Sequence, residues 1–146
     1  MPHAVIDIEL FFKTYEQRIN SGDIPALVAQ FSDAFLAAGA QGAQPVRAVD
    51  FAVALPKRKQ LFDSLGCRST SLVSFEPVAL DGRYTLVRTR WQMVFDRAQG
   101  AAEEEVLADS TFIVDDSDSG LKIVFYLAHQ DIMAMLKERG IMAGAA

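Results

Sequence analysis

Apolar residues in the first part of the chain recur at the spacing of an amphipathic helix. The stripe begins at Val5 and returns every three or four residues, at Ile8, Phe12, Tyr15 and Ile19. Such steps place the side chains on one face of a helix of about four turns. The sequence therefore predicts a first helix whose apolar face packs against the rest of the fold.

Turn-forming residues end this helix and begin a shorter one. Gly22 suits the left-handed conformation that often follows a helix, Asp23 is a typical N-cap, and Pro25 fits a first helical turn. The apolar side of the second helix consists of Ile24, Leu27, Val28 and Phe31. Residues 33–38 have a strand-like pattern. Residues 39–45 are predicted as a loop, whose glycines lack the spacing of a phosphate-binding loop.

A third helical pattern covers residues 48–65. Its apolar face consists of Phe51, Leu55, Phe62 and Leu65, with Asp50 as a candidate N-cap and Gly66 at the end. Pro56 lacks a backbone donor, so we expect it to kink or split this helix. The dense basic cluster Lys57-Arg58-Lys59 is interpreted as a solvated helix face rather than an anion site.

From Cys67 onward the apolar period changes from about 3.6 to about 2. The alternation predicts four strands joined by hairpins, at residues 67–78, 83–97, 104–115 and 120–129, and then a last helix at residues 131–139. Because helices come first and antiparallel strands follow, the pattern predicts an α+β fold in a single domain, residues 1–146.

The alternation also assigns the two faces of the predicted sheet. The strongly apolar face consists of Val87, Thr89, Trp91, Met93 and Phe95, then Val106, Ala108, Ser110, Phe112 and Val114, and finally Leu121, Ile123, Phe125 and Leu127. The opposite face mixes charges with Leu107, Ile113, Val124 and Tyr126. Because such apolar residues are usually covered, we expect a homodimer through this outer face.

Composition excludes several classes of protein. The net charge of −5 disfavours nucleic acid as a partner. No apolar run is long enough to span a membrane, and the first residues lack the pattern of a signal peptide. The single Cys67 fits a reducing compartment, so we expect a cytoplasmic protein. His3 and His129 are too few to suggest a metal centre, and no metal or other cofactor is predicted.

Two segments resemble the nuclear transport factor 2-like superfamily, including its ketosteroid isomerase, polyketide cyclase and SnoaL-like branches. Residues 20–33 read Asn-Ser-Gly-Asp-Ile-Pro-Ala-Leu-Val-Ala-Gln-Phe-Ser-Asp and resemble its recurrent pattern N-x-G-D-h-x-x-h-x-x-x-F-x-D, where h is apolar. Residues 108–112 and 122–124 are similar to its penultimate hairpin. The resemblance implies a cystatin-like cone, in which a curved antiparallel sheet wraps around a long N-terminal helix and leaves a pocket at the wide end.

The ketosteroid isomerase branch suggests roles for individual residues. The resemblance aligns Tyr15 with a tyrosine that donates a hydrogen bond to a developing enolate oxygen. The position of the aspartate base holds Gly39, and that of a second, protonated aspartate holds Ser110. Asp109 would turn inward only if the strand register shifted by one residue. Because part of the machinery is missing, steroid isomerisation is not predicted.

The leading hypothesis is a binding protein whose apolar pocket takes a small hydrophobic molecule, aromatic or carbonyl-containing. The predicted pocket wall consists of Tyr15, Phe35, Phe51, Leu55, Trp91, Met93, Ser110, Phe112 and Phe125. Tyr15 and Ser110 are the predicted polar anchors, since such sites combine apolar walls with few polar groups.

Two alternatives stay open. In a cyclase, isomerase or dehydratase, Tyr15 would polarise a carbonyl, and His129 or Asp109 would carry the proton. His129 shares its strand face with Phe125 and Leu127, which would place it at the pocket rim. In an association module, the chain's own side chains would fill the cone and the outer sheet face would be the functional surface.

Overall fold

A computed structural model describes residues 5–97 and 102–142. The elements are α1 (Val5–Ser21), α2 (Ile24–Val28), β1 (Phe31–Gly39), β2 (Gly42–Arg47), α3 (Ala48–Ser64), β3 (Cys67–Ala79), β4 (Tyr84–Phe95), β5 (Glu104–Ser117), β6 (Gly120–Ala128) and α4 (Ile132–Glu138). The fold is α+β, and the predicted strands from Cys67 onward and the last helix are confirmed. His3 and the side chain of Val5 lie outside the described part.

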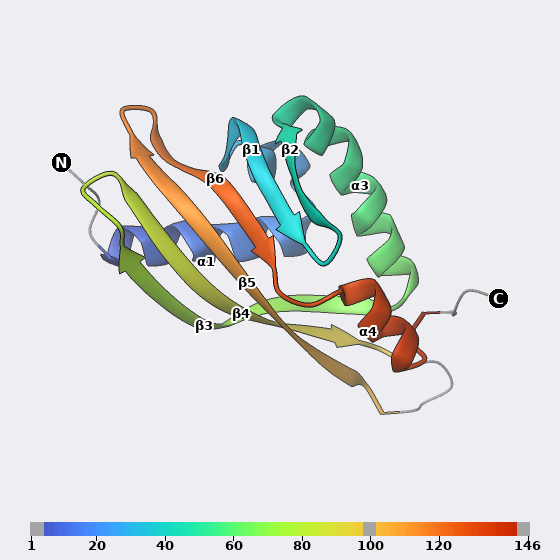
Figure 1. Cartoon of the computed structure of the whole chain (residues 1–146). Coiled ribbons are helices and arrows are strands. Elements are labelled where there is room, and N and C mark those ends of the chain that lie inside the picture. Colours follow the sequence, from blue (N-terminus) through green and yellow to red (C-terminus); the bar gives the residue numbers. More distant parts are fainter. Residues whose placement is uncertain (1–4, 98–101, 143–146) are drawn as a thin grey trace.

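The six strands form one curved sheet in the order β2-β1-β6-β5-β4-β3. Neighbouring strands are antiparallel except β1 and β6, which run parallel. Figure 1 shows α1 lying across one face of this sheet, α3 beside β1 and β2, and α4 near one end of β4 and β5. We call the face toward α1 the inner face and the opposite one the outer face.

Residues 39–45, predicted as a loop, contain much of an edge strand. β2 pairs with β1 from Gly39↔Gly42 to Ala34↔Arg47. Pro45 is tolerated because β2 lies at the edge of the sheet, where a missing N–H removes no bond to a further strand. The residues of β2 are mostly exposed, so its sequence lacks the apolar alternation that would predict a strand.

α3 differs from its predicted form at two positions. The helix continues through Pro56, so the expected split does not occur. Pro56 and Ala52 are both exposed, and water can therefore solvate the Ala52 carbonyl that the proline leaves without a donor. Asp50 lies inside the first turn, and Arg47 holds the N-cap position without a capping side-chain hydrogen bond.

Two hydrophobic clusters form the core. The larger joins α1 to the inner face and includes Phe12, which is fully buried, and Trp91. The smaller joins α4 to the end of β4 and the start of β5 and includes Leu136 and Met93. Trp91 and Met93 lie two residues apart on one face of β4 and belong to different clusters. The boundary between the clusters therefore crosses the inner face at this point.

The predicted alternation reverses within β6. The register shifts after Ile123, where a β-bulge interrupts the pairing with β5. Beyond the bulge Phe125 pairs with Ile113 on the outer face, and Tyr126 pairs with Phe112 on the inner face. The prediction that Phe125 lines the interior is wrong, because one extra residue in a strand changes the side of every residue that follows it.

Gly66, between α3 and β3, occupies a position that excludes a side chain. Its φ is +89°, and a Cβ placed there would lie 2.6 Å from the backbone oxygen of Asp96. The Asp96 N–H also donates to the Gly66 carbonyl at 2.8 Å, which holds the two backbones together. We predict that Gly66→Ala lowers the free energy of unfolding, measured with urea, by about 2–4 kcal/mol, because it combines a left-handed alanine with an overpacked contact.

Gly42→Ala is the matched control for this substitution. The φ of Gly42 is +106°, but nothing lies within 4 Å of a Cβ placed there. We expect this variant to lose only about 1 kcal/mol, the backbone part of the cost. Equal losses in the two variants would contradict the proposed clash at Gly66.

Candidate functional site

Tyr15 lies on the inward side of α1, among aromatic rings of the inner face. Its ring centroid is 5.6 Å from those of Trp91 and Phe112 and 6.1 Å from that of Phe31. Tyr15 is half-buried, and its hydroxyl is crowded by protein atoms without being fully removed from solvent. The helical stripe of α1 thus carries one polar group into the larger hydrophobic cluster.

Burial keeps the Tyr15 phenol neutral. Loss of hydration raises the pKa of Tyr15 far above its ordinary value of 10.0, the nearby Tyr126 phenol raises it further, and the Arg58 guanidinium opposes the shift. No residue in the described part of the chain forms a hydrogen bond with this hydroxyl. Tyr15 is therefore a neutral donor that lacks an acceptor there.

A row of small side chains crosses the inner face next to Tyr15. Thr89, Ser110 and Ala128 pair with one another across β4, β5 and β6. Trp91 and Phe112 belong to the rows on either side of this one. Because the Tyr15 ring contacts both, it lies over the small residues. The inner face thus has a floor of small side chains between aromatic walls.

Hydrogen bonds fix part of this floor. Trp91 Nε1 donates to Thr89 Oγ1 at 2.8 Å, and Thr89 Oγ1 donates to the backbone carbonyl of Ser110 at 2.9 Å. This chain of bonds orients the indole ring. Ser110 is only 7% exposed, and its hydroxyl forms no hydrogen bond with a described residue.

The structure brings most of the predicted wall residues together. Those that form the larger cluster or pack against it are Tyr15, Phe35, Phe51, Trp91 and Phe112. Met93 lies in the smaller cluster, and Leu55 is half-buried on α3. Phe125 faces outward, and Tyr126 occupies the inner position beyond the bulge. That these residues bind a ligand stays a prediction.

Two polar groups near Tyr15 are absent from the predicted site. Tyr126 reaches the inner face because of the bulge in β6. Arg58 lies on α3, with its guanidinium carbon 4.9 Å from the centroid of the Phe62 ring. The sequence signal for Arg58 was its helical spacing from Leu55 and Phe62, which places all three on one face.

Asp109 lies on the outer face, on the side of the sheet opposite to Tyr15. Arg90 Nε donates to Asp109 Oδ1 at 2.7 Å, and Gln130 Nε2 donates to Oδ2 at 3.0 Å. Arg90 and then Gln130 hold the pKa of Asp109 below its usual range. This carboxylate is engaged by its neighbours and is not brought together with Tyr15.

His129 also lies with residues of the outer face. Its Nε2 is 2.7 Å from Thr111 Oγ1, and Thr111 pairs with Leu127 beyond the bulge. The strand face that His129 shares with Phe125 and Leu127 is therefore the outer one. Its expected place at the rim of the inner pocket is wrong for the same reason as that of Phe125.

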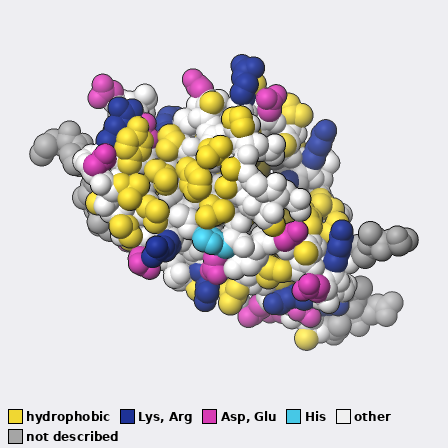
Figure 2. All heavy atoms as spheres, in the orientation of Figure 1, with side chains coloured by type: hydrophobic (Ala, Val, Ile, Leu, Met, Phe, Trp, Pro, Cys, Tyr) yellow, Lys and Arg dark blue, Asp and Glu magenta, His cyan; other side chains and the backbone are white. Residues whose placement is uncertain are grey.

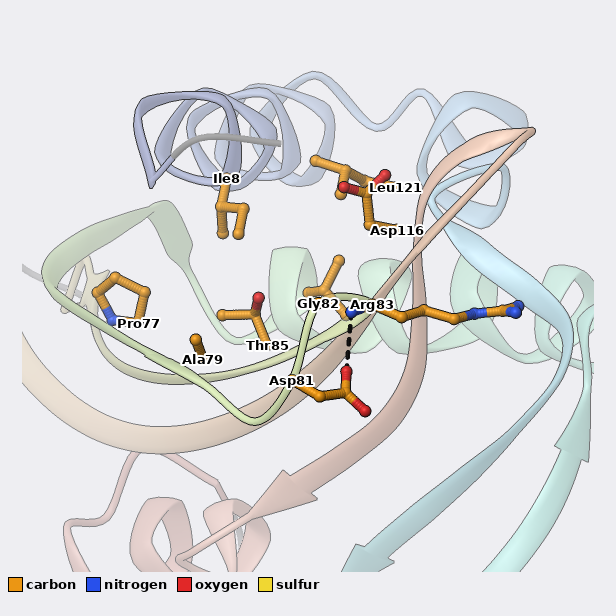
Figure 3. Close-up of a pocket in the computed structure, with 10 residues that line it drawn as sticks. Ile8, Pro77, Ala79, Asp81, Gly82, Arg83, Thr85, Asp116 and Leu121 are labelled. Carbon is orange, nitrogen blue, oxygen red and sulfur yellow. Dashed lines mark hydrogen bonds between the residues drawn. The ribbon is translucent and has the colours of Figure 1, made fainter. Parts of the chain in front are cut away.

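An open cavity of about 230 Å³ lies near the beginning of α1. Its lining residues are Ile8, Pro77, Ala79, Asp81, Gly82, Arg83, Thr85, Val114, Asp116 and Leu121. Figure 3 shows Ile8 pointing from α1 toward the β3–β4 hairpin. A wider depression of about 570 Å³ lies beside Gly66, Asp96 and Ile141. Neither cavity is lined by Tyr15 or by the other predicted wall residues.

Charged side chains beside the cavity near α1 form hydrogen bonds that stabilise the neighbouring turn and strands. Arg83 donates two hydrogen bonds to Asp115, from Nε to Oδ1 at 2.6 Å and from Nη2 to Oδ2 at 3.0 Å. Asp81 Oδ1 accepts from the backbone N–H groups of Arg83 and Tyr84, each at 2.8 Å, and these bonds lower the pKa of Asp81. The Asp81 bonds close the β3–β4 turn, and the Arg83–Asp115 pair joins this turn to β5.

Metal-binding clusters are absent from the described residues, among which no three His, Cys, Asp or Glu side chains come together in a suitable group. Over the same residues, no helix is long and apolar enough to cross a membrane. Cys67 is half-buried on β3, and burial raises the pKa of its thiol.

Comparisons with known proteins identify the fold. No family model and no curated protein matches the chain. An NTF-2 like protein of unknown function from Shewanella oneidensis MR-1 matches 85% of this chain and 97% of its own, with 18% identity and a TM-score of 0.67. An NTF2-like protein with a cystatin-like fold from Novosphingobium aromaticivorans matches 94% and 87%, with 12% identity and a TM-score of 0.71. The beta subunit of benzoate 1,2-dioxygenase from Burkholderia mallei matches 92% and 95%, with 14% identity and a TM-score of 0.67.

Other solved structures with the same fold have varied descriptions. They include a putative calcium/calmodulin dependent protein kinase II association domain and a putative polyketide cyclase, both from Xanthomonas campestris, and a ketosteroid isomerase-like protein from Erwinia carotovora. At such low identities the likeness shows the fold alone. It confirms the NTF2-like, cystatin-like fold that residues 20–33 suggested.

The buried Tyr15 phenol should make the chain less stable in alkaline solution. Its pKa in the folded chain lies above the ordinary value of 10.0, so the unfolded chain loses this proton first as the pH rises. Its contribution to stability is fully present below about pH 10 and decreases above it, by up to about 1.4 kcal/mol per pH unit. We predict that Tyr15→Phe removes this part of the slope, measured by urea denaturation at a series of alkaline pH values. The same slope in both proteins would contradict the burial of the hydroxyl.

Proposed function

We propose that this chain, a single domain with the NTF2-like, cystatin-like fold, binds a small apolar molecule between α3 and the inner face of the sheet. The observation that carries the proposal is the Tyr15 hydroxyl, a neutral donor whose ring lies among aromatic rings and which lacks an acceptor among the described residues. A donor that is largely removed from water and has no protein partner loses hydrogen bonding, which costs free energy. A ligand with a carbonyl or similar oxygen supplies the acceptor.

The shape of the inner face supports the same location. Thr89, Ser110 and Ala128 contribute little side-chain volume to the floor, and Trp91 and Phe112 stand on either side. A flat apolar molecule there contacts aromatic walls, and the Ser110 hydroxyl is available as a second polar anchor.

Entry of the ligand requires α3 to move outward, and the packing of α3 supports such a movement. None of its 17 residues is fully buried. Its aromatic contacts with the larger cluster come from Phe51, whose ring centroid is 4.7 Å from that of Phe31 and 5.1 Å from that of Phe35. Elements with few buried contacts open at low free-energy cost. We therefore assign α3 the role of a cover over the site.

The surroundings of Tyr15 favour binding over catalysis. A cyclase, isomerase or dehydratase needs a proton carrier within hydrogen-bonding reach of its substrate. Asp109 and His129 face the other side of the sheet. The ionisable groups that act on Tyr15 are the phenol of Tyr126 and the guanidinium of Arg58, rather than a carboxylate or an imidazole.

Binding can be tested with 2-acetylnaphthalene, a flat aromatic ketone, by titration against the fluorescence of Trp91, the single tryptophan. We expect Tyr15→Phe to weaken binding by about tenfold, the effect of losing one hydrogen bond to an enclosed acceptor. Tyr84→Phe is the control, because Tyr84 lies beside Arg83 at the β3–β4 turn and outside the aromatic cluster. Absence of binding to the unaltered chain, or equal losses in the two variants, would refute the proposal.

We also propose that the chain is a homodimer that forms through the outer face of the sheet, in the cytoplasm. One cross-strand row on this face is apolar in all six strands, and it consists of Pro45, Leu36, Phe125, Ile113, Leu86 and Val78. Figure 2 shows hydrophobic side chains gathered on this side of the molecule. Leu36 and Val78 are each 39% exposed. A single cysteine, Cys67, is consistent with the cytoplasm.

Two further observations support association through this row. The next row becomes polar at Thr111, Arg88 and Glu76, which resembles the rim of a protein interface. Two of the solved counterparts are described as a subunit and as an association domain. A second copy of the same chain can cover the apolar row and remove it from water, so no different partner protein is needed.

Leu36→Lys tests the dimer, because it places a charge within the apolar row, at a position that is 39% exposed. We expect the unaltered chain to have about twice the chain mass of 16.0 kDa by light scattering at micromolar concentration, and the variant to have the mass of one chain. Val53→Lys is the control, since Val53 is 62% exposed on α3, away from the sheet. A single-chain mass for the unaltered protein, or dissociation caused by Val53→Lys, would contradict the proposed interface.

A further inference from the structure

β3 lies at one edge of the sheet, and its middle has the composition of a segment that pairs readily with other chains. Residues 69–75 read Ser-Thr-Ser-Leu-Val-Ser-Phe and contain no charge, proline or glycine. Val73, at a β-bulge of this strand, is 52% exposed. Uncharged segments of this length and composition form strands between molecules when their backbone groups are free. We call residues 69–75 the β3 edge segment.

Some backbone groups of this segment point away from β4. In an antiparallel pair, only every second residue exchanges hydrogen bonds with the residue opposite to it. The N–H groups of Thr70 and Leu72 donate to side chains of α1 rather than to β4. They therefore belong to the free side of β3, which is the side that a strand of a second chain would approach.

Two side chains of α1 bind these edge groups. Asn20 Oδ1 accepts from the Thr70 N–H at 2.8 Å, and Asn20 Nδ2 donates to the Thr70 carbonyl at 2.7 Å. Nδ2 also donates to the Glu16 carbonyl at 3.1 Å, which fixes the orientation of the amide. Glu16 Oε2 accepts from the Leu72 N–H. The Asn20 amide thus forms both bonds that a neighbouring strand would form with Thr70.

The spacing of the two elements explains why two residues of one helix fit this strand. Glu16 and Asn20 are four residues apart on α1, which is about 6 Å along a helix axis. Thr70 and Leu72 are two residues apart on β3, which is about 6.6 Å along a strand. The side chains of α1 therefore match the repeat of the backbone groups along the edge.

Other stretches of free edge are interrupted by proline. Pro77 lies in the later part of β3, and Pro45 lies in β2, the strand at the opposite edge of the sheet. Because proline has no N–H, it prevents continuous pairing with a further strand. The β3 edge segment has no proline, and its edge groups are bound by α1 instead.

We propose that Glu16 and Asn20 form an edge cap, which keeps the β3 edge segment from pairing with the same segment of a second copy of this chain. Without these side chains, packing alone holds the last turns of α1 against β3, and the helix end can separate from the edge. The freed groups then pair from chain to chain, because every copy presents the same segment. This inference is independent of the proposed ligand and of the proposed dimer.

The test uses the double variant Glu16→Ala/Asn20→Ala, with circular dichroism to show that it is folded. We expect hydrogen exchange in residues 69–75, followed by mass spectrometry, to become at least about tenfold faster. We also expect particles that scatter light and bind thioflavin T, a dye that fluoresces on stacked strands. The control is Glu9→Ala/Gln17→Ala, which removes the same charge and amide from exposed positions of α1 and should change neither measurement.

Two further variants separate the edge cap from general instability. Leu136→Ala removes a fully buried side chain of α4, in the smaller cluster, and leaves the edge cap intact. Equally rapid particle formation by Leu136→Ala would overturn the inference, as would equal behaviour of the double variant and its control. Adding Val73→Lys to the double variant places a charge in the β3 edge segment and should suppress the particles, and unchanged particles would also overturn it. If the double variant does not fold, Asn20→Ala alone is compared with Gln17→Ala in the same measurements.

Discussion

The bulge in β6 is the constraint on which both faces of the sheet depend. β6 is a central strand, paired antiparallel with β5 and parallel with β1, so its register is held on both sides. Before the bulge Ile123 packs into the larger cluster, and after it Phe125 turns outward and Tyr126 turns inward. A β-bulge can be accommodated in this position because the shift also bends the strand, as a sheet that curves around a helix requires.

One extra residue therefore has two effects that support each other. On the inner face it brings Tyr126 to 5.2 Å from the Phe112 ring and close enough to act on Tyr15. On the outer face it places Phe125 between Leu36 and Ile113, which completes the apolar row across the sheet. Without the bulge, the smaller Val124 would pair with Ile113 in the outer row, and Phe125 would face Phe112 in place of the second phenol inside. The inner site and the outer surface are thus set by the same local feature.

How much of this could be predicted depends on whether the signal is local. The stripe from Ile8 to Ile19, the turn at Gly22 and the alternation in β4 and β5 reflect the period of one element, and they were predicted correctly. β2 was missed because an exposed edge strand needs no apolar face, and the bulge was missed because Val124 fits either alternation. The same limit applies to the site. Periodicity alone places Tyr15, Trp91 and Phe112 together. The inward position of Tyr126 depends on the bulge, and the lack of a carboxylate partner for Arg58 depends on the pairing of its neighbour Lys59 with Asp63.

The sheet also separates two kinds of chemistry. Asp109 and His129, the groups suited to proton transfer, lie on the outer side within a network that includes Arg90, Thr111 and Gln130. On the inner side the polar groups near Tyr15 are phenols, a serine hydroxyl and a guanidinium, which donate hydrogen bonds to an oxygen acceptor. A site built from donors stabilises an oxygen acceptor, and the ionisable groups that act on Tyr15 among the described residues include no carboxylate or imidazole to remove a proton. This asymmetry supports the proposal that the inner site binds a carbonyl-bearing molecule.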